Sequence, residues 1–260
     1  MKTRVISGLI MVPFLVIFYF GGMVLTAACF VIGIMGIYEF YKGFHKMGIK
    51  PNYLIGFVAT IALYVINLCG GQEQWYMLWF FGVVLSSLLY LFRIHKRRLE
   101  DAMATVLGVF YVVFFSFHVV LVDQTGAPSI LVWLIVFSAF GTDVMAYFTG
   151  FAFGKHKLCP KISPKKTIEG SIGGILGSML VCGVFGWFFA SEYFMHCVII
   201  GALGGVISQF GDLTASIFKR KMGIKDYGNL IPGHGGILDR FDSVLFTAPL
   251  IYYYIVLVIG

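Results

Sequence analysis

Long apolar stretches with almost no charged residues dominate the chain. A helix needs about 20 mostly apolar residues to cross ~30 Å of hydrocarbon. Residues 5–38 are too many for one crossing, and Gly21-Gly22 lies near their middle, so we predict two helices joined by a tight turn. The pattern predicts seven further spans, at about 53–69, 75–92, 102–122, 129–150, 170–190, 193–211 and 242–259.

Composition agrees with this pattern. Apolar residues make up 59% of the chain and charged residues 12%, with a mean hydropathy of +0.91, whereas soluble domains have about 45–50% apolar and 25% charged residues. These values exclude a water-soluble fold, a disordered chain and a nucleic-acid binder. Since backbone polar groups inside a bilayer must be paired within the protein, we predict an all-α, polytopic membrane protein with nine spans.

The positions of the basic residues predict the orientation. With the N-terminus inside, all 19 Lys and Arg fall in inner segments, and the outer connections carry only Glu73, Asp123 and Glu192. Positive charge marks the cytoplasmic side of short loops. We therefore expect a multi-pass protein of the cell's inner membrane, with a retained first helix, a cytoplasmic N-terminus and an outer C-terminus. Residues 1–128 hold five spans, and residues 129–260 hold four spans and two polar inner loops, 151–169 and 211–242.

Acidic residues gather toward the inner side of the C-terminal half. Asp143 lies inside the sixth span, where a carboxylate is costly unless it meets a cation, a polar cavity or a partner. The alternative to a functional role is a protonated carboxyl that is hydrogen-bonded to a neighbouring helix. Asp212 ends the eighth span, and Asp239 and Asp242 share one face at the head of the ninth. Carboxylates that meet at one depth favour a divalent cation, and all-oxygen ligation suits Mg²⁺.

Basic and glycine-rich segments accompany these acids. The basic residues that we expect to surround them are Lys165, Lys166, Lys219, Arg220, Lys225 and Arg240. The turn Gly233-His234-Gly235-Gly236 precedes a predicted helix start, where converging N–H groups favour an anion. The residues alone therefore predict an inner-face site for a metal–nucleotide complex at the lipid boundary.

One segment has a recognisable pattern. Residues 216–242 read S-I-F-K-R-K-M-G-I-K-D-Y-G-N-L-I-P-G-H-G-G-I-L-D-R-F-D, and this resembles the signature of the phosphatidate cytidylyltransferases, or CDP-diacylglycerol synthases, without departure over 27 residues. Segments 143–150, 163–170 and 209–212 are also similar to that family. The resemblance covers roughly the C-terminal half, so nothing functional is carried onto the first ~120 residues, which we interpret as a scaffold.

The resemblance implies Mg²⁺-dependent transfer of the cytidylyl group of CTP to phosphatidate, with residues 129–260 as the catalytic region. The implied metal ligands are Asp212, Asp239 and Asp242, with Asp143 as a fourth ligand or a group beside it. Lys219, Arg220, Lys225 and Arg240 would bind the triphosphate or the leaving pyrophosphate. Lys165 and Lys166 would bind either substrate's phosphates, and the role of a second cation stays open.

The remaining matched positions receive secondary roles. The turn 233–236 would supply backbone donors, with His234 donating to an oxygen, and Asp226 would orient Lys225. The other residues expected near substrate are Thr167, Glu169, Ser216, Gly235 and Gly236. We expect Asp239→Asn to leave folding intact and to abolish turnover.

Two other functions are kept as alternatives. One is another CTP-dependent lipid or polyprenol kinase; the related CDP-alcohol phosphotransferases would need a D-G-x₂-A-R motif that is absent from the chain. The other is an anion transporter, although transporters usually place their site at the bilayer midplane between repeats. Expected partners are CTP, phosphatidate and the bilayer, with no nucleic acid, and a homodimer is allowed.

Overall fold

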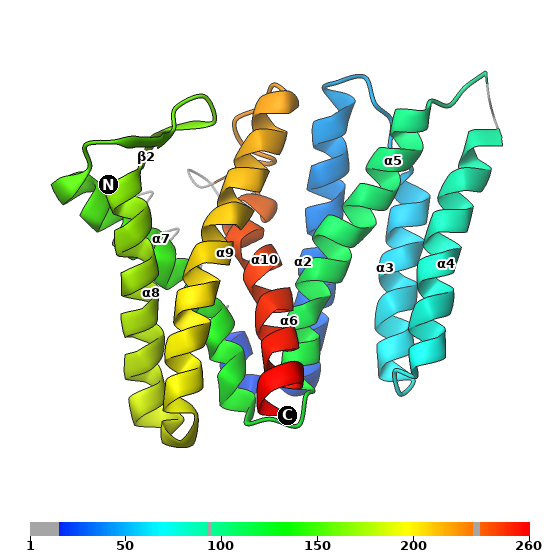
Figure 1. Cartoon of the computed structure of the whole chain (residues 1–260). Helices are drawn as coiled ribbons and strands as arrows, with labels where there is room; N and C mark the ends of the chain where they lie inside the picture. The colour runs from blue at the N-terminus through cyan, green and yellow to red at the C-terminus, as the bar shows by residue number, and fades with distance from the viewer. Residues whose placement is uncertain (1–15, 93–94, 231–234) are drawn as a thin grey trace.

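The computed structural model of the chain describes residues 16–92, 95–230 and 235–260 as one bundle of roughly aligned helices (Figure 1). The first part contains α2 (Gly22–His45), α3 (Tyr53–Leu68), α4 (Glu73–Leu89), the turn η1 (Tyr90–Phe92), α5 (Leu99–Gly108), the π-helical η2 (Val109–Phe114) and α6 (Phe115–Asp123). The second part contains η3 (Ser129–Val132), α7 (Trp133–Phe153), β1 (Lys157–Cys159), β2 (Ser163–Thr167), α8 (Ile168–Phe189), η4 (Ser191–Tyr193), α9 (Phe194–Lys221), α10 (Leu238–Tyr254) and η5 (Ile255–Ile259).

The structure confirms the predicted fold class, a nearly all-α protein with several membrane-spanning helices. Seven helices of the described residues are long and apolar enough to cross a bilayer. The predicted span at 53–69 appears as α3, whose 16 residues cover only about 24 Å at ~1.5 Å per residue. Apart from residues 16–20, the first predicted span lies outside the described residues. The count of nine and the sidedness of the termini therefore stay predictions.

The break predicted at Gly21-Gly22 is confirmed. Gly21 has a φ of +57°, which L side chains rarely adopt, and α2 begins immediately after it. The Gly22 N–H donates to Asp123 Oδ2 at 2.7 Å, so the acid at the end of α6 caps the start of α2. This contact closes the end of the bundle opposite to the basic loops.

The inner loop predicted to start at Gly211 is wrong in its first eleven residues, because α9 continues to Lys221. No Gly or Pro interrupts residues 212–222. Three basic residues occupy the last turn, where positive charge interacts favourably with the negative end of the helix dipole. Gly223, at a φ of +67°, ends the helix: its N–H bonds to Arg220 O, and the Ile224 N–H bonds to Lys219 O. Asp212 therefore lies within a helix.

The other inner loop contains a small exception to the all-α expectation. Strands β1 and β2 form an antiparallel hairpin in which Lys157 faces Thr167 and Cys159 faces Ser163. The Ile168 N–H then bonds to His156 O at 2.9 Å, so the hairpin leads directly into α8. The hairpin holds its lysines over one end of the bundle.

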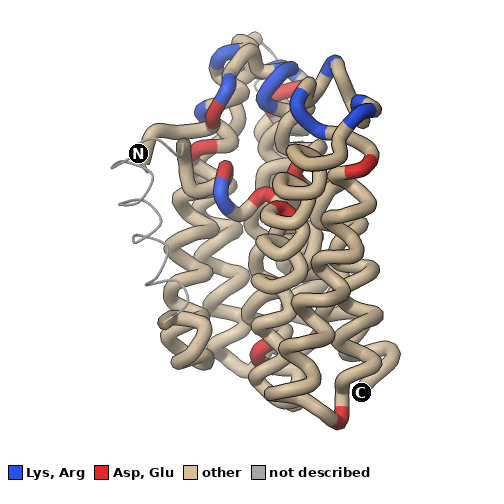
Figure 2. Tube along the Cα trace, turned by 90° about the vertical axis from the view of Figure 1, so that its left-hand side faces the viewer, with Lys and Arg blue, Asp and Glu red and all other residues tan. Residues whose placement is uncertain are grey.

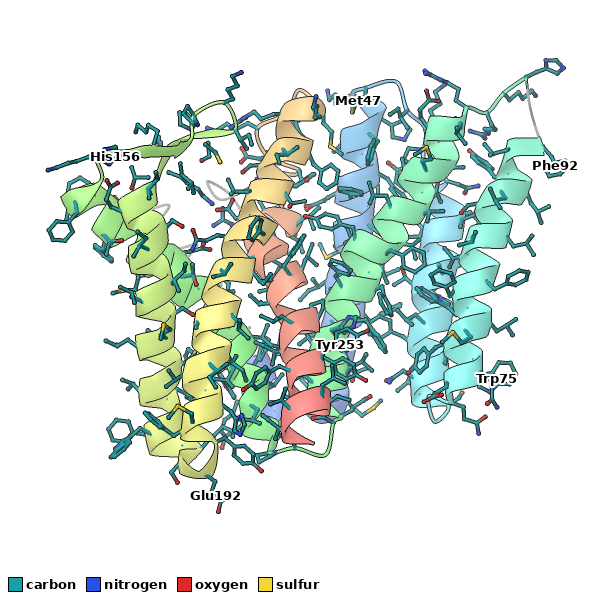
Figure 3. All side chains as sticks on the ribbon, in the orientation of Figure 1. Met47, Trp75, Phe92, His156, Glu192 and Tyr253 are labelled. Carbon is teal, nitrogen blue, oxygen red and sulfur yellow. The ribbon has the colours of Figure 1, made fainter. Side chains whose placement is uncertain are left out.

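Charge is distributed unevenly along the bundle axis. Lys and Arg of the described residues gather toward one end (Figure 2). Met47 and His156 lie at that basic end, whereas Glu192 and Trp75 lie at the opposite end (Figure 3). This arrangement agrees with the basic loops predicted on one side of the membrane.

Helix α10 lies centrally in the bundle, in contact with α9, α6, α7 and α2. Helices α7, α8 and α9 pack closely through small residues, as membrane helices commonly do. A Cβ on Gly201 would lie 2.8 Å from Met179 Cα, and one on Gly174 would lie 3.0 Å from Thr142 O. This close packing brings acids from α7, α9 and α10 toward one another.

Candidate functional site

A cavity of about 600 Å³ lies at the basic end between α7, the hairpin, α8 and α9. Its polar lining includes two acids, three lysines and several neutral side chains, namely Asp143, Asp212, Lys157, Lys165, Lys166, Ser163, Thr167, Ser171 and Gln209. Tyr147 and Phe151 also line it, and both are largely exposed, at 68% and 83%. The cavity therefore joins a charged interior to aromatic side chains on the outside of the bundle.

Three of the four predicted acids interact with one another. Asp143 lies near enough to Asp212 for electrostatic repulsion, and Asp242 interacts in the same way with both. Lys166 forms an ion pair with Asp212, and the two side chains are only 27% and 25% exposed. Arg240 also acts electrostatically on Asp143. These residues on α7, β2, α9 and α10 interact electrostatically and carry opposite charges.

The set suits a divalent cation in its chemistry, since every donor is a carboxylate oxygen. Across residues 16–92, 95–230 and 235–260, however, no three His, Cys, Asp or Glu side chains are arranged so as to hold one metal ion. Lys166 provides the positive charge beside Asp212 instead. A bound cation would require the carboxylates to move closer together, and the magnesium site stays a prediction.

Asp239, the fourth acid, is bound by protein donors. Its Oδ1 accepts from Lys219 Nζ at 2.8 Å, and its Oδ2 accepts from the N–H groups of Tyr227 and Gly236 at 2.8 and 2.9 Å. The side chains of Asp239 and Lys219 are 2% and 13% exposed. Burial raises the pKa of Tyr227, whose hydroxyl donates to Ala215 O at 3.3 Å. Asp239 therefore joins α9, the loop that follows it and α10.

The start of α10 is capped by an acid that the sequence interpretation left out. Glu39 of α2 accepts from the N–H groups of Ile237 and Leu238 at 3.1 and 2.9 Å. Within the turn 233–236 the Gly236 N–H is bonded to Asp239, so this donor is used within the protein, while phosphate binding by the turn stays a prediction. Glu39 is a buried acid one residue beyond the end of the second predicted span, and the rule that singled out Asp143 applies to it equally.

The hairpin residues divide into two groups. Lys165 is exposed at the cavity. Thr167 is buried and caps α8, since its Oγ1 accepts from Gly170 N at 3.1 Å. The Glu169 carboxylate accepts from the N–H groups of Lys155 and His156 and lies 2.6 Å from His156 Nδ1. The structure thus gives Thr167 and Glu169 contacts that shape the hairpin, and leaves Lys165 and Lys166 facing the cavity.

The remaining predicted residues lie on α9 and the loop after it. Ser216 Oγ donates to Asp212 Oδ1 at 3.4 Å, and Arg220 Nε donates to Ile162 O of the hairpin at 3.4 Å. Lys225 and Asp226 are exposed. Gly235 adopts a φ of +88° beside the Asp239 carboxylate. His234 and Gly233 lie outside the described residues, so their predicted roles are not addressed.

Comparison with known proteins places the chain. The model of the cytidylyltransferase family matches residues 2–258. The chain belongs to this family. A phosphatidate cytidylyltransferase of Staphylococcus epidermidis is 36% identical over 96% of this chain and 97% of its own length. Those of Synechocystis and Bacillus subtilis are 34% and 29% identical, covering 92% and 99% of this cytidylyltransferase and 90% and 98% of their own lengths.

The match extends beyond the resemblance found in the sequence. That resemblance covered roughly the C-terminal half, whereas the family model and the relatives cover nearly the whole chain. The membrane helices of the N-terminal half therefore belong to the cytidylyltransferase fold. Glu39, which lies in that half and bonds to α10, is one physical link between the two parts.

Proposed function

We propose that this membrane cytidylyltransferase transfers the cytidylyl group of CTP to phosphatidate, giving CDP-diacylglycerol and pyrophosphate. The observation that carries the proposal is the cavity at the basic end, which combines lysines and carboxylates among membrane helices. The proteins that this chain resembles along nearly its full length are named phosphatidate cytidylyltransferases. We further propose that the basic end faces the cytoplasm, where CTP is available.

The reaction needs little acid–base chemistry from the protein. The phosphate monoester of phosphatidate is already an anionic nucleophile; one of its oxygens forms a bond to the α-phosphorus of CTP. The bond from that phosphorus to the bridging oxygen breaks, and pyrophosphate leaves with the electron pair. Catalysis then consists of holding two anions together and neutralising the charge that develops.

The lysines of the cavity are suited to that task. Lys165 is exposed at its lining, and Lys166 faces it while paired with Asp212. We assign both to phosphate oxygens, with Lys166 exchanging its carboxylate partner for a phosphate when substrate enters. Arg240 lies close enough to Asp143 to add positive charge on the α10 side.

A divalent cation is part of the proposal. Asp143, Asp212 and Asp242 are the residues that would hold it, because their carboxylates interact with one another and two of them line the cavity. The cation would neutralise triphosphate charge and the leaving pyrophosphate. We leave Asp239 out of this set because both of its oxygens already bind protein donors.

The lipid needs a route that keeps its acyl chains in the membrane. Tyr147 and Phe151 line the cavity and are exposed on the outer surface of α7. The two rings stack on each other, with centroids 6.4 Å apart, so we propose that the phosphatidate head group enters beside this pair, with its chains lying along the apolar surface of α7. Such an opening brings the lipid phosphate to Lys165 and Lys166 without moving the whole lipid into water.

The test uses CTP labelled at either the α- or the γ-phosphate, incubated with purified protein and phosphatidate in detergent micelles. Cytidylyl transfer moves the α-label into the lipid and releases the γ-label as pyrophosphate. Transfer of the γ-label to lipid would identify a kinase and overturn the proposal. Absence of any labelled lipid from folded protein would overturn it as well.

A further inference from the structure

We propose that Glu39 is a positioning residue of this cytidylyltransferase: from α2 it fixes the start of α10 and thereby the residues that α10 presents to the cavity. Its side chain is almost fully buried, at 7% exposure. Both of its carboxylate oxygens are used, Oε1 by the Ile237 N–H and Oε2 by the Leu238 N–H. The partners lie about two hundred positions away along the chain, so a residue of the N-terminal half holds an element of the C-terminal half.

The first turn of a helix has N–H groups with no partner inside the helix, and a carboxylate there is favoured by both hydrogen bonding and the helix dipole. Helix α10 uses two such carboxylates. Asp239, in its own first turn, takes the Gly236 N–H, and Glu39 takes the next two. Because Asp239 is also tied to Lys219 on α9, the first turn is held from α9 and from α2 together.

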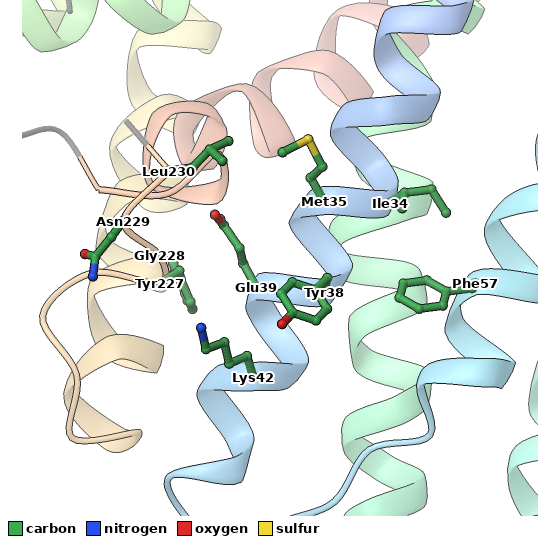
Figure 4. A pocket seen from close by; sticks show the side chains of 10 residues that line it. All are labelled: Ile34, Met35, Tyr38, Glu39, Lys42, Phe57, Tyr227, Gly228, Asn229 and Leu230. Carbon is green, nitrogen blue, oxygen red and sulfur yellow. The ribbon is translucent and has the colours of Figure 1, made fainter. Parts of the chain in front are cut away.

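The surrounding backbone is shaped to admit this carboxylate. A Cβ added to Gly228 or Gly236 would collide with the oxygens of Glu39. Figure 4 shows the Glu39 side chain directed from α2 toward the loop that carries Tyr227, Gly228 and Asn229, on the wall of a second cavity of about 410 Å³. The two glycines leave room for the acid between the loop and α10.

The consequence concerns Arg240 and Asp242, which lie on the turn of α10 that follows the cap. Asp242 interacts electrostatically with Asp143 and Asp212, and Arg240 with Asp143. A shift of the helix start by a fraction of an ångström changes these distances. Loss of Glu39 is therefore expected to alter CTP binding and turnover, although Glu39 does not line the cavity that we assign to CTP.

The test compares Glu39→Gln and Glu39→Ala with the wild type and with Glu192→Gln, an exposed acid at the opposite end of the bundle (Figure 3). Gln keeps one acceptor and turns an amide NH₂ toward the second N–H, whereas Ala removes both acceptors. Amide hydrogen exchange in peptides covering residues 235–243 is expected to rise roughly tenfold or more, in the order wild type, Gln, Ala. Exchange at α10 that equals the wild type in both Glu39 variants would overturn the cap.

The kinetic readout rests on the proposed function. In the folded, monodisperse fraction we expect the KM for CTP to rise at least fivefold in Glu39→Ala, with a fall in kcat, and neither to change in Glu192→Gln. A merely structural role would reduce the yield of active enzyme but leave KM unchanged, and that result would refute positioning. Wild-type protein that forms no CDP-diacylglycerol would refute the proposed function. The hydrogen-exchange data would still test whether Glu39 caps α10.

A second variant covers the case in which Glu39→Ala fails to fold. Gly228→Ala pushes a methyl group against the Glu39 carboxylate without removing it, so it is expected to raise both α10 exchange and the KM for CTP. In the Glu39→Ala background the clash with the carboxylate is gone, and Gly236 Cα, at 3.2 Å, is the one close atom left. Where Glu39→Ala does fold, the double variant should therefore be only slightly worse than Glu39→Ala alone. If the increases in α10 exchange and in the KM for CTP multiply in the double variant, Gly228 and Glu39 act independently, and the proposal is contradicted.

Discussion

Replacing Asp239 by Asn separates a structural role from a role in binding ligand. Asn keeps the shape of the side chain but leaves Lys219, which is 13% exposed, without its partner at 2.8 Å. It also removes charge from the acceptor that binds the N–H groups of Tyr227 and Gly236. Breaking a buried ion pair by removing one partner costs about 3–5 kcal/mol. At roughly 2–4 °C per kcal/mol for a chain of about this size, the melting temperature should fall by about 6–20 °C.

The assay is thermal unfolding of purified protein in one detergent, followed by intrinsic fluorescence. The family resemblance predicts instead that Asp239→Asn folds normally and loses only turnover, so the melting temperature distinguishes the two expectations. The double variant Lys219→Met with Asp239→Asn removes the unpaired cation and should recover at least half of the lost melting temperature. A variant Asp239→Asn that melts within ~1 °C of the wild type, a negligible shift on this scale, and yet is inactive would show that Asp239 acts on substrate or metal. That result would refute the structural role of the Asp239–Lys219 ion pair.

Three further predictions follow from separate contacts. Lys166→Met should lower kcat/KM for CTP by about 10²–10³-fold, the usual cost of losing one electrostatic contact to the reacting group. The control Lys155→Met, at an exposed lysine of the same segment, should stay near the wild-type kcat/KM. Equal activities of the two variants would show that Lys166 is not part of the site. Chelation with EDTA should abolish lipid labelling and added Mg²⁺ should restore it, and activity that survives full chelation would remove the cation from the mechanism. Asp123→Ala should destabilise the protein by about 0.5–2 kcal/mol through loss of the α2 cap with unchanged kinetics, and an unchanged melting temperature would show that this cap is dispensable.

The parts of the fold set by local chemistry could be predicted from the sequence. Apolar stretches indicate membrane helices because the bilayer leaves backbone groups few alternatives, and Gly21 marks a turn because few other residues adopt its φ. The end of α9 was misplaced because the basic residues at 219–221 were interpreted as a loop. They form the last helical turn, and Gly223 is the actual stop.

The site was predictable in its composition but less so in its pairings. Asp143, Asp212 and Asp242 do approach one another, and Lys166 does lie with them. The partners of Asp239 could not be foreseen, since two of them are backbone N–H groups that carry no sequence signal. Glu39 could have been singled out as an acid beside an apolar stretch, but its partners could not, because they are backbone groups far away along the chain.

In the proposed mechanism, nucleotide and lipid phosphate meet in the cavity between α7, the hairpin, α8 and α9. An experimental structure of the protein with Mg²⁺ and a non-hydrolysable CTP analogue tests it most directly. We predict triphosphate density at Lys165 and Lys166 and a cation on at least two of the carboxylates of Asp143, Asp212 and Asp242. Triphosphate density elsewhere, with this cavity empty and Lys166 still paired with Asp212, would contradict it.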